Sequence, residues 1–211
     1  MPKMNRDVPL LVKALKKYYS DAHCALYYHS PFQLLVATIL SAQCTDERVN
    51  KVTPGLFKKY PSSQELAAVS QEDLEREIRS TGFFRNKAKS IRRMSKLVLE
   101  KYLGQVPRTM DELLELPGVA RKTANVVLGN AFKVAVGVVV DTHVMRLSQR
   151  LGLTKHKDPK RIENDLIKKL PQSDWIWFSH ALIIHGRKVC KARNPACFSC
   201  PIKEHCPNPV L

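Results

Sequence analysis

Apolar side chains recur every three or four residues along most of the chain, which places them on one face of a helix. Prolines and glycines, Pro54 among them, fall between these segments, where they break or end helices. The one strand-like run, VAVGVVV at 134–140, has no second run to pair with, and we expect a buried extended connection there. The helices predicted by this pattern span 11–19, 32–43, 71–80, 87–103, 109–116, 122–132, 142–151, 160–170 and 174–190.

The composition favours a core-forming protein with a polyanionic partner. The chain has 211 residues, of which 44% are apolar, enough for one large domain or two small ones. Lys and Arg exceed Asp and Glu by 35 − 19 = 16, and such a surplus attracts nucleic acid over long range. A merely basic protein is the alternative. The N-terminal segment lacks the apolar region of a signal peptide, and no apolar run approaches the ~18 residues of a membrane span.

Four of the six cysteines fall in one stretch, CKARNPACFSCPIKEHC, at residues 190–206. In a cytosolic chain, which we expect here, thiols stay reduced, so a metal site is favoured over disulfides. A zinc ribbon usually has two C-x2-C pairs, whereas this spacing, C-x6-C-x2-C-x5-C, has one. Uneven spacing of four thiolates suits a cubane iron–sulfur cluster, and we favour that over zinc. Cys24 and Cys44 are isolated and are expected to be small buried apolar side chains. The four candidate ligands are Cys190, Cys197, Cys200 and Cys206.

The stretch TMDELLELPGVARKTANVVLGNA, at 109–131, predicts two helices joined by a tight turn. Thr109 followed by Glu112 fits a capping box at the start of the first helix, and the second begins at about Arg121. Gly118 permits a positive φ and the close approach of another backbone. The amides after it would point outward at the positive end of the second helix, where a phosphate binds readily. An ordinary corner between helices is the alternative, and the neighbouring basic residues favour the phosphate interpretation.

Lys122 and Asp141 each occupy the start of a predicted helix. The helix dipole, the neighbouring Arg121 and partial burial would disfavour the ammonium form of Lys122. A neutral amine is a nucleophile toward a sugar C1′, although most lysines beside a phosphate site simply neutralise it. Asp141 follows a wholly apolar run and is expected to be an N-cap. It could also serve as a carboxylate at the mouth of a cleft, an electrostatic or acid–base partner for the lysine.

Taken together, LPGVARKTANVVL, VDTHVMRL, LLVATILSAQCTD and the cysteine tail resemble the endonuclease III family, over roughly residues 30–206. These are DNA glycosylases with abasic-site lyase activity in the helix–hairpin–helix superfamily. The resemblance implies an all-α, two-lobed fold, with DNA running across the cleft between the lobes. A helical barrel lobe would span 25–138, with the helix–hairpin–helix at about 109–131. An iron–sulfur cluster lobe would combine 1–24 with 139–211.

The resemblance also implies roles for particular residues. Lys122 matches the family's Schiff-base lysine, and Asp141 matches its catalytic aspartate. Gln43, in SAQCTD, matches a residue that enters the gap left by the extruded base. Phe83, in TGFFRNKA, matches an apolar wedge on the opposite strand and is bulkier than the usual aliphatic side chain. The ligands of a [4Fe–4S] cluster would be Cys190, Cys197, Cys200 and Cys206.

Further DNA contacts are expected around these positions. In the hairpin, Gly118, Ala120 and Arg121 would face phosphates, although LPGVA replaces the family's LPGVG and alanine tolerates a left-handed backbone less well than glycine. Lys191 and Arg193, in the loop between the first two clustered cysteines, are expected to reach phosphates. The last of the expected contacts, chosen for its closeness to the wedge, is Lys87.

The activity that follows from the resemblance is base-excision repair. Oxidised or ring-saturated pyrimidines would be removed through a lysine Schiff base, and the strand cut 3′ to the abasic site by β-elimination. The expected partner is double-stranded DNA with damaged pyrimidines or abasic sites. The protein is expected to be a monomer with no membrane partner. Its expected location is the cytoplasm of a prokaryote, in association with the nucleoid. The alternatives are a relative of the adenine mismatch glycosylases, a non-catalytic helix–hairpin–helix DNA-binding module, and a zinc-stabilised nucleic-acid-binding protein.

Overall fold

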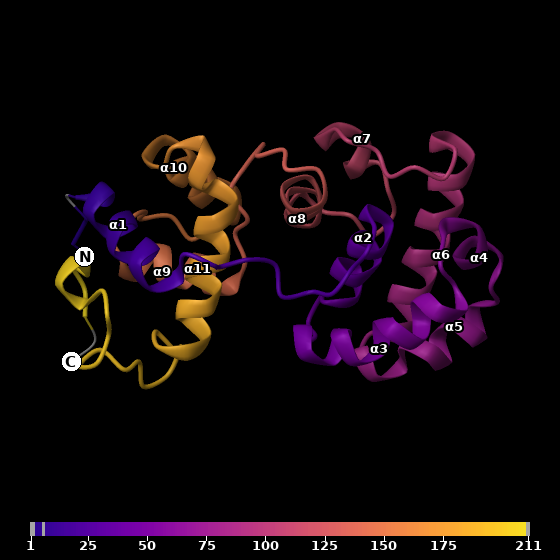
Figure 1. Ribbon diagram of the computed structural model, residues 1–211, viewed down its shortest axis with the longest axis horizontal. Helices are drawn as coiled ribbons and strands as arrows, with labels where there is room; N and C mark the ends of the chain where they lie inside the picture. The colour runs from indigo at the N-terminus through magenta and orange to yellow at the C-terminus, as the bar shows by residue number, and fades with distance from the viewer. Residues whose placement is uncertain (1–2, 6, 210–211) are drawn as a thin grey trace. The chain divides into compact units, whose positions relative to one another are not determined.

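The computed structural model describes residues 3–5 and 7–209, and within them the regular secondary structure is entirely helical (Figure 1). The chain divides into two compact units. One combines the N-terminal residues up to His23 with Gly137 onward, and the other runs from Cys24 to Val136. None of the helices in the described residues is long and apolar enough to cross a membrane. The fold class predicted from the sequence, all-α, is confirmed.

The unit that holds both chain ends is built around α11. Helices α9 and α1 pack against α11, and α10 packs against α9. Their buried side chains form one apolar core, in which Leu11, Leu147, Phe178 and Leu182 are fully buried. The indole N–H of Trp177 donates to the Tyr19 carbonyl at 2.6 Å, which ties α11 to the end of α1. The helices of this unit are α1 (Val8–Tyr19), α9 (Thr142–Arg150), α10 (Pro159–Lys169), η2 (Gln172–Asp174), α11 (Trp175–Lys188) and η3 (Lys203–His205).

In the second unit, α2 and α6 are the central helices. Eight of the ten residues of α2 are buried, so this helix is apolar all round and is enclosed by α3, α6 and α8. Helix α6 packs against α4 and α5 through one apolar stripe, which includes Ile91, Met94 and Val98. The helices of this unit are α2 (Pro31–Leu40), α3 (Asp46–Lys59), α4 (Ser63–Ala68), α5 (Gln71–Ile78), η1 (Arg79–Thr81), α6 (Phe84–Tyr102), α7 (Met110–Leu114) and α8 (Arg121–Ala131).

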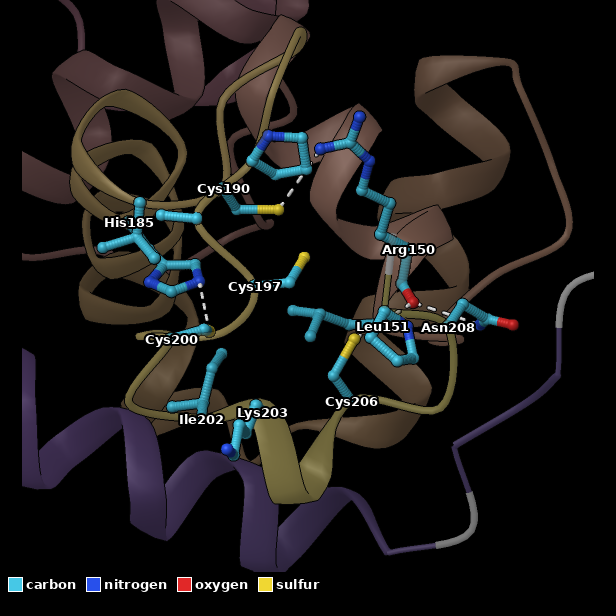
Figure 2. A pocket seen from close by; sticks show the side chains of 14 residues that line it. Arg150, Leu151, His185, Cys190, Cys197, Cys200, Ile202, Lys203, Cys206 and Asn208 are labelled. Atoms are coloured by element: carbon cyan, nitrogen blue, oxygen red, sulfur yellow. Dashed lines mark hydrogen bonds between the residues drawn. The ribbon is translucent and has the colours of Figure 1, made fainter. Parts of the chain in front are cut away.

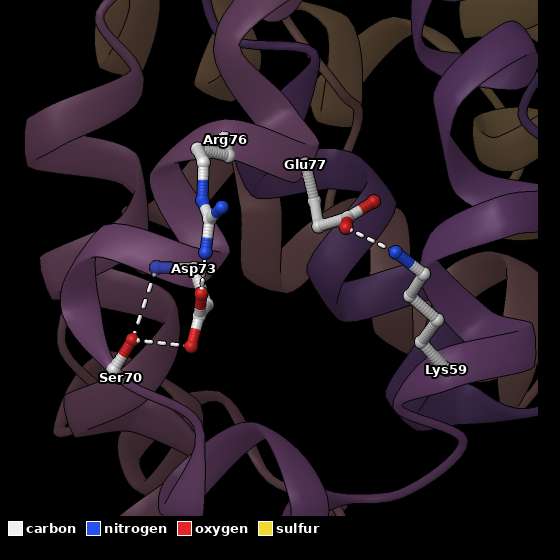
Figure 3. A network of polar contacts seen from close by, with 5 residues as sticks. All are labelled: Lys59, Ser70, Asp73, Arg76 and Glu77. Carbon is white, nitrogen blue, oxygen red and sulfur yellow. Dashed lines mark hydrogen bonds and ion pairs between the residues drawn. The ribbon is translucent and has the colours of Figure 1, made fainter.

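Polar contacts cap α5 and join it to α3 (Figure 3). Ser70 caps α5 by accepting from the Asp73 N–H at 3.0 Å, and its hydroxyl donates to the Asp73 carboxylate at 2.7 Å. Arg76 pairs with the same carboxylate one turn later. Lys59, at the end of α3, pairs with Glu77 of α5 at 2.5 Å, and this bond raises the pKa of the lysine. Such pairs at the surface stabilise a fold only slightly, and the Lys59–Glu77 pair is the one among them that joins α3 to α5.

Two helices of the second unit, α3 and α4, were not predicted. In α3 the placement of Pro54 between helices was wrong, because this proline lies inside the helix. Both Pro54 and Gly55 are exposed, so the backbone bond that a proline removes is lost on the face turned to water. The buried face carries Val49, Thr53 and Leu56, and this packing outweighs the helix-breaking pair.

The run VAVGVVV at 134–140 forms no strand, as predicted, and connects α8 to α9. Its second half, Val138 to Val140, is buried as expected. Its first half is not, because Val134 and Val136 are 41% and 38% exposed. The change from exposed to buried comes where the chain passes from one unit to the other, at Val136 and Gly137.

Candidate active site and metal centre

The predicted hairpin is present between α7 and α8. Thr109 caps α7 by accepting from the Glu112 N–H at 3.4 Å, and its hydroxyl donates to the Glu112 carboxylate at 2.6 Å. Gly118 has a φ of 81°, the left-handed conformation that the sequence predicted for the turn. Helix α8 then begins at Arg121, with Ala120 as its N-cap residue.

The two positions of the turn have different backbone requirements. A Cβ added at Gly118 would lie 2.8 Å from the Ser90 Cβ on α6, so the turn approaches that helix too closely for any side chain. Ala120 is extended instead, with φ −99° and ψ 169°. The penalty that alanine would suffer in a left-handed conformation therefore does not arise, and the LPGVA turn forms without it.

Lys122 is the second residue of α8 and its side chain is exposed. The partial burial expected from the sequence is wrong. The next seven residues of the helix are all buried, from Thr123 to Gly129, so the lysine stands where α8 emerges from the core. The N-cap residue, Ala120, offers no side-chain hydrogen bond to this end of α8, and the positive end of the helix dipole favours an anion there.

Asp141 is the N-cap of α9, as predicted. Its carboxylate accepts from the Val144 N–H at 2.8 Å, which fixes the side chain against the helix. Arg146, one turn further on, donates to the carbonyls of Gly186 and Cys190, at 3.0 Å each. Burial lowers the pKa of His143, which faces the same arginine. Asp141 belongs to the unit with both chain ends, and Lys122 belongs to the other.

One pocket of the second unit collects four sequence-predicted DNA contacts, of which Lys87 is treated separately below. It is lined by Gln43, which follows α2, by Phe83, which precedes α6, and by Gly118 of the hairpin. Gln43 and Phe83 are exposed, the latter by 63%, and both have left-handed backbones, with φ of 52° and 46°. Two exposed side chains on left-handed loops beside a phosphate-facing turn make this pocket the candidate DNA-reading surface.

The prediction of Lys87 as a phosphate contact needs correction. Lys87 is 5% exposed, and its ammonium donates to the carbonyls of Leu40 and Thr81, each at 2.7 Å. A buried amine held by two carbonyls does not reach the DNA backbone. Nearness in sequence to Phe83 suggested the contact, but the side chain points into the protein.

The four clustered cysteines line one pocket of the unit with both chain ends (Figure 2). Arg150 donates to the Cys190 sulfur at 3.4 Å, and the His185 Nε2 lies 3.7 Å from the Cys200 sulfur. Burial lowers the pKa of His185 to about 4, and its Nδ1 lies 2.7 Å from the Tyr19 hydroxyl. With Tyr19 donating to Nδ1, the neutral imidazole carries its proton on Nε2 and directs it at the sulfur.

The lining of this pocket fits an iron–sulfur cluster. A cubane spreads four thiolates over four irons, so it needs cysteines around a common hollow rather than at one point. N–H donors to the sulfurs are the outer contacts that such clusters use, and here Arg150 and His185 supply them. Burial raises the pKa of the Cys200 and Cys206 thiols. Iron bound to these sulfurs would have the opposite effect, because a metal cation favours the thiolate.

Arg150 also anchors the loop that carries two predicted phosphate contacts. It donates to the carbonyls of Lys191 at 2.6 Å and Ala192 at 3.0 Å. The side chains of Lys191 and Arg193 are exposed. Sequence reasoning missed this arginine and Arg146, although their spacing of four residues on one helix, next to Asp141, was a usable signal. The isolated Cys24 and Cys44, predicted to be buried, are half-buried.

Comparison with known proteins agrees with these features. The family described as "HhH-GPD superfamily base excision DNA repair protein" matches residues 36–172. Endonuclease III of Synechocystis is 60% identical over 194 residues, covering 92% of this chain and 89% of that protein. A solved non-covalent endonuclease III–DNA complex and a trapped covalent endonuclease III–DNA intermediate are each 45% identical, with TM-scores of 0.92. Both cover 97% of this chain, and the matches cover 95% and 96% of those chains.

The fold, the hairpin and the superfamily match thus define a helix–hairpin–helix protein of base excision DNA repair. At this level of identity and coverage, the chain belongs to the endonuclease III family.

Proposed function

We propose that this protein removes oxidised or ring-saturated pyrimidines from double-stranded DNA and cuts the strand 3′ to the abasic site. As a member of the endonuclease III family, it is a base-excision DNA glycosylase with abasic-site lyase activity that acts on DNA. The observation that carries the finer proposal is the position of Lys122. Its exposed side chain stands at the positive end of α8, shortly after the turn at Gly118.

The chemistry proposed for Lys122 is nucleophilic. Its neutral amine attacks C1′ of the damaged nucleotide, so that a C–N bond forms while the glycosidic bond breaks and the base leaves with the electron pair. The adduct loses a proton from its nitrogen, and the C1′–O4′ bond then breaks as O4′ takes a proton. The protonated imine that results acidifies the C2′ hydrogen. Loss of that proton expels the 3′ phosphate oxygen and cuts the strand. A 45% identical endonuclease III has been solved as a trapped covalent DNA intermediate, which supports a covalent route.

Asp141 is proposed to assist this attack. Its carboxylate is held in place by the Val144 N–H. An ionised carboxylate stabilises positive character on the sugar and can accept a proton as the imine forms. The N-cap role and the catalytic role are compatible, because the cap gives the side chain a fixed position before DNA arrives.

The turn and the pocket beside it are proposed to bind and distort the duplex. The amides at the start of α8 receive a phosphate, and phosphate contacts set the register without reading the base. Gln43 then fills the gap left by the extruded nucleotide, and Phe83 wedges into the opposite strand. Extrusion costs least where stacking or pairing is already weak, which favours damaged pyrimidines.

The cysteine pocket is proposed to hold a [4Fe–4S] cluster through Cys190, Cys197, Cys200 and Cys206. When bound, the cluster supplies a structural cross-link rather than a step of the reaction. Arg150 and His185 orient the sulfurs, and Arg150 also holds the backbone of the loop at Lys191. The exposed Lys191 and Arg193 would then meet phosphates from a fixed loop.

Borohydride trapping tests the nucleophile. Incubation with an abasic-site duplex and borohydride should give a covalent adduct with the wild type and none with Lys122→Gln. The affinity of the variant for DNA should stay within about tenfold, or ~1.4 kcal/mol, because one phosphate-proximal charge is lost. Lys133→Gln is the matched control, since it removes an exposed lysine just beyond the other end of α8. Adduct formation that survives in Lys122→Gln would contradict the assignment, and a wild type that forms no adduct would favour a mismatch glycosylase or a non-catalytic module.

A further inference from the structure

Lys87 forms an internal bridge that the proposed function does not use. Its ammonium is buried and donates to the carbonyl of Leu40, the last residue of α2, and to that of Thr81, the last residue of η1. Both bonds are 2.7 Å long. These two carbonyls lie 41 positions apart in the sequence (81 − 40 = 41), so a single side chain fastens together the ends of two separate helical segments.

The Lys87 ammonium is well suited to binding carbonyls at the C-terminal ends of helices. The last carbonyls of a helix lack partners within it and form the negative end of its dipole. An ammonium has three donors and one positive charge, so it satisfies a carbonyl at each end. Burial lowers the pKa of Lys87, and the two short bonds offset this cost. Without the amine, two buried carbonyls would lose their partner, which costs far more than the loss of an exposed lysine.

The bridged carbonyls stand directly before the two loops that carry Gln43 and Phe83. Gln43 follows Leu40 by three residues, and Phe83 follows Thr81 by two. Both side chains are exposed on left-handed backbones, which persist where the surrounding structure holds them. Lys87 also lines the pocket that Gln43 and Phe83 share, and its backbone N–H donates to the Phe83 carbonyl at 3.1 Å.

We propose that Lys87 is a positioning residue that holds the Gln43 and Phe83 loops at a fixed spacing, so that both side chains enter the duplex together. The inference rests on the proposed function, in which these two residues fill and wedge the DNA. Lys87 itself touches neither substrate nor the reacting atoms. Its loss should therefore affect the extrusion of a paired nucleotide rather than the attack of Lys122 on C1′.

A ratio of two rates separates positioning from general damage to the fold. Single-turnover excision at saturating enzyme is measured with one ring-saturated pyrimidine, once paired opposite a purine and once in a single-nucleotide bulge. The bulged lesion is unpaired and needs little wedging. In Lys87→Met the ratio of the paired to the bulged rate should fall by about tenfold, since losing wedge support leaves part of the cost of extruding a paired nucleotide uncompensated. Lys89→Met, which removes an exposed lysine from the same helix, should leave the ratio unchanged.

A second background tests whether Lys87 acts through the two loops. In a Gln43→Ala, Phe83→Ala protein the ratio should already be low, and adding Lys87→Met should lower it no further, because coupled residues are not additive. A Lys87→Met variant that slows both lesions equally, or that lowers the ratio further on this background, would overturn the proposal. If Lys87→Met does not fold, Lys87→Gln, which keeps one N–H donor group without the charge, serves in the same comparison. A wild type that excises neither lesion would refute the proposed function instead.

Discussion

Replacing Gly118 by alanine tests the hairpin most directly, because two separate costs can be estimated at this position. The φ of 81° is one that residues with a Cβ rarely adopt, and such a conformation costs about 1–2 kcal/mol. The added Cβ would also lie 2.8 Å from the Ser90 Cβ and 3.2 Å from its hydroxyl oxygen, so α6 or the turn has to shift. Overpacking of this kind costs roughly 1–3 kcal/mol.

Gly118→Ala should therefore lower the free energy of unfolding by about 3 kcal/mol, which corresponds to a fall of roughly 6–12 °C in Tm for a chain of this length. The matched control is Ala120→Gly. Ala120 has an extended backbone that any residue can adopt, so glycine relieves no strain there. It should cost at most about 1 kcal/mol, through the greater freedom of the unfolded chain. Urea denaturation followed by circular dichroism measures both values.

The contact with Ser90 can be tested separately from the backbone strain. Ser90→Gly removes the atoms that the new Cβ would meet, but it leaves the φ of residue 118 unchanged. On the Gly118→Ala background it should recover about 1 kcal/mol relative to additivity. The reasoning is refuted if Ala120→Gly is as damaging as Gly118→Ala, or if the Ser90 and Gly118 substitutions show no coupling. Affinity for an undamaged duplex should fall with Gly118→Ala as well, since the turn holds a phosphate.

The remaining predictions concern Asp141 and the cysteine pocket. Asp141→Asn should leave the stability within about 0.5 kcal/mol, because asparagine caps a helix as well as aspartate does, yet it should strongly slow single-turnover excision; equal rates in the variant and the wild type would remove the carboxylate from the mechanism. Cys197→Ser should lower the iron content and make the salt dependence of DNA binding shallower, by up to ~0.9 for each phosphate that Lys191 and Arg193 no longer neutralise. A normal salt slope together with failure to cleave abasic sites would instead implicate the cluster in the chemistry.

The helices predicted from the sequence are those in which the apolar positions of the sequence are also the buried positions of the structure. The apolar runs of α2, α8 and α11 are each enclosed by other helices, so their side chains are apolar at helical spacing. Helix α3 was missed for the opposite reason. Only three of its residues are buried, and Pro54-Gly55 has the composition of a turn. Only the packing of Val49 and Leu56 against the rest of the unit identifies it as a helix.

The features of the candidate site that depend only on nearby residues in the chain could be predicted from the sequence. The φ of Gly118, the N-cap role of Asp141 and the start of α8 at Arg121 are all local features, and each was correctly expected from neighbouring residues. The exposure of Lys122 was not, because burial depends on which helices cover the turn. The extended backbone of Ala120 is the one usual for an N-cap residue, a position that the sequence analysis did not assign to it.

Lys87 shows why a charged residue near a functional loop is a poor guide to direct contact. Phe83 and Lys87 are four residues apart, and a lysine so close to a wedge would ordinarily be assigned to the phosphates. The helix decides otherwise, because Phe83 stands before its first turn and faces solvent, while Lys87 lies on the face of α6 that is buried against Leu40. The chain thus places a cation where two helical segments end, beside the loops that have to withstand the duplex. A residue in that position supports binding by fixing the positions of the two loops. The effect of its substitution should therefore be judged by the ratio of the excision rates for the paired and the bulged lesion, rather than by affinity for DNA alone.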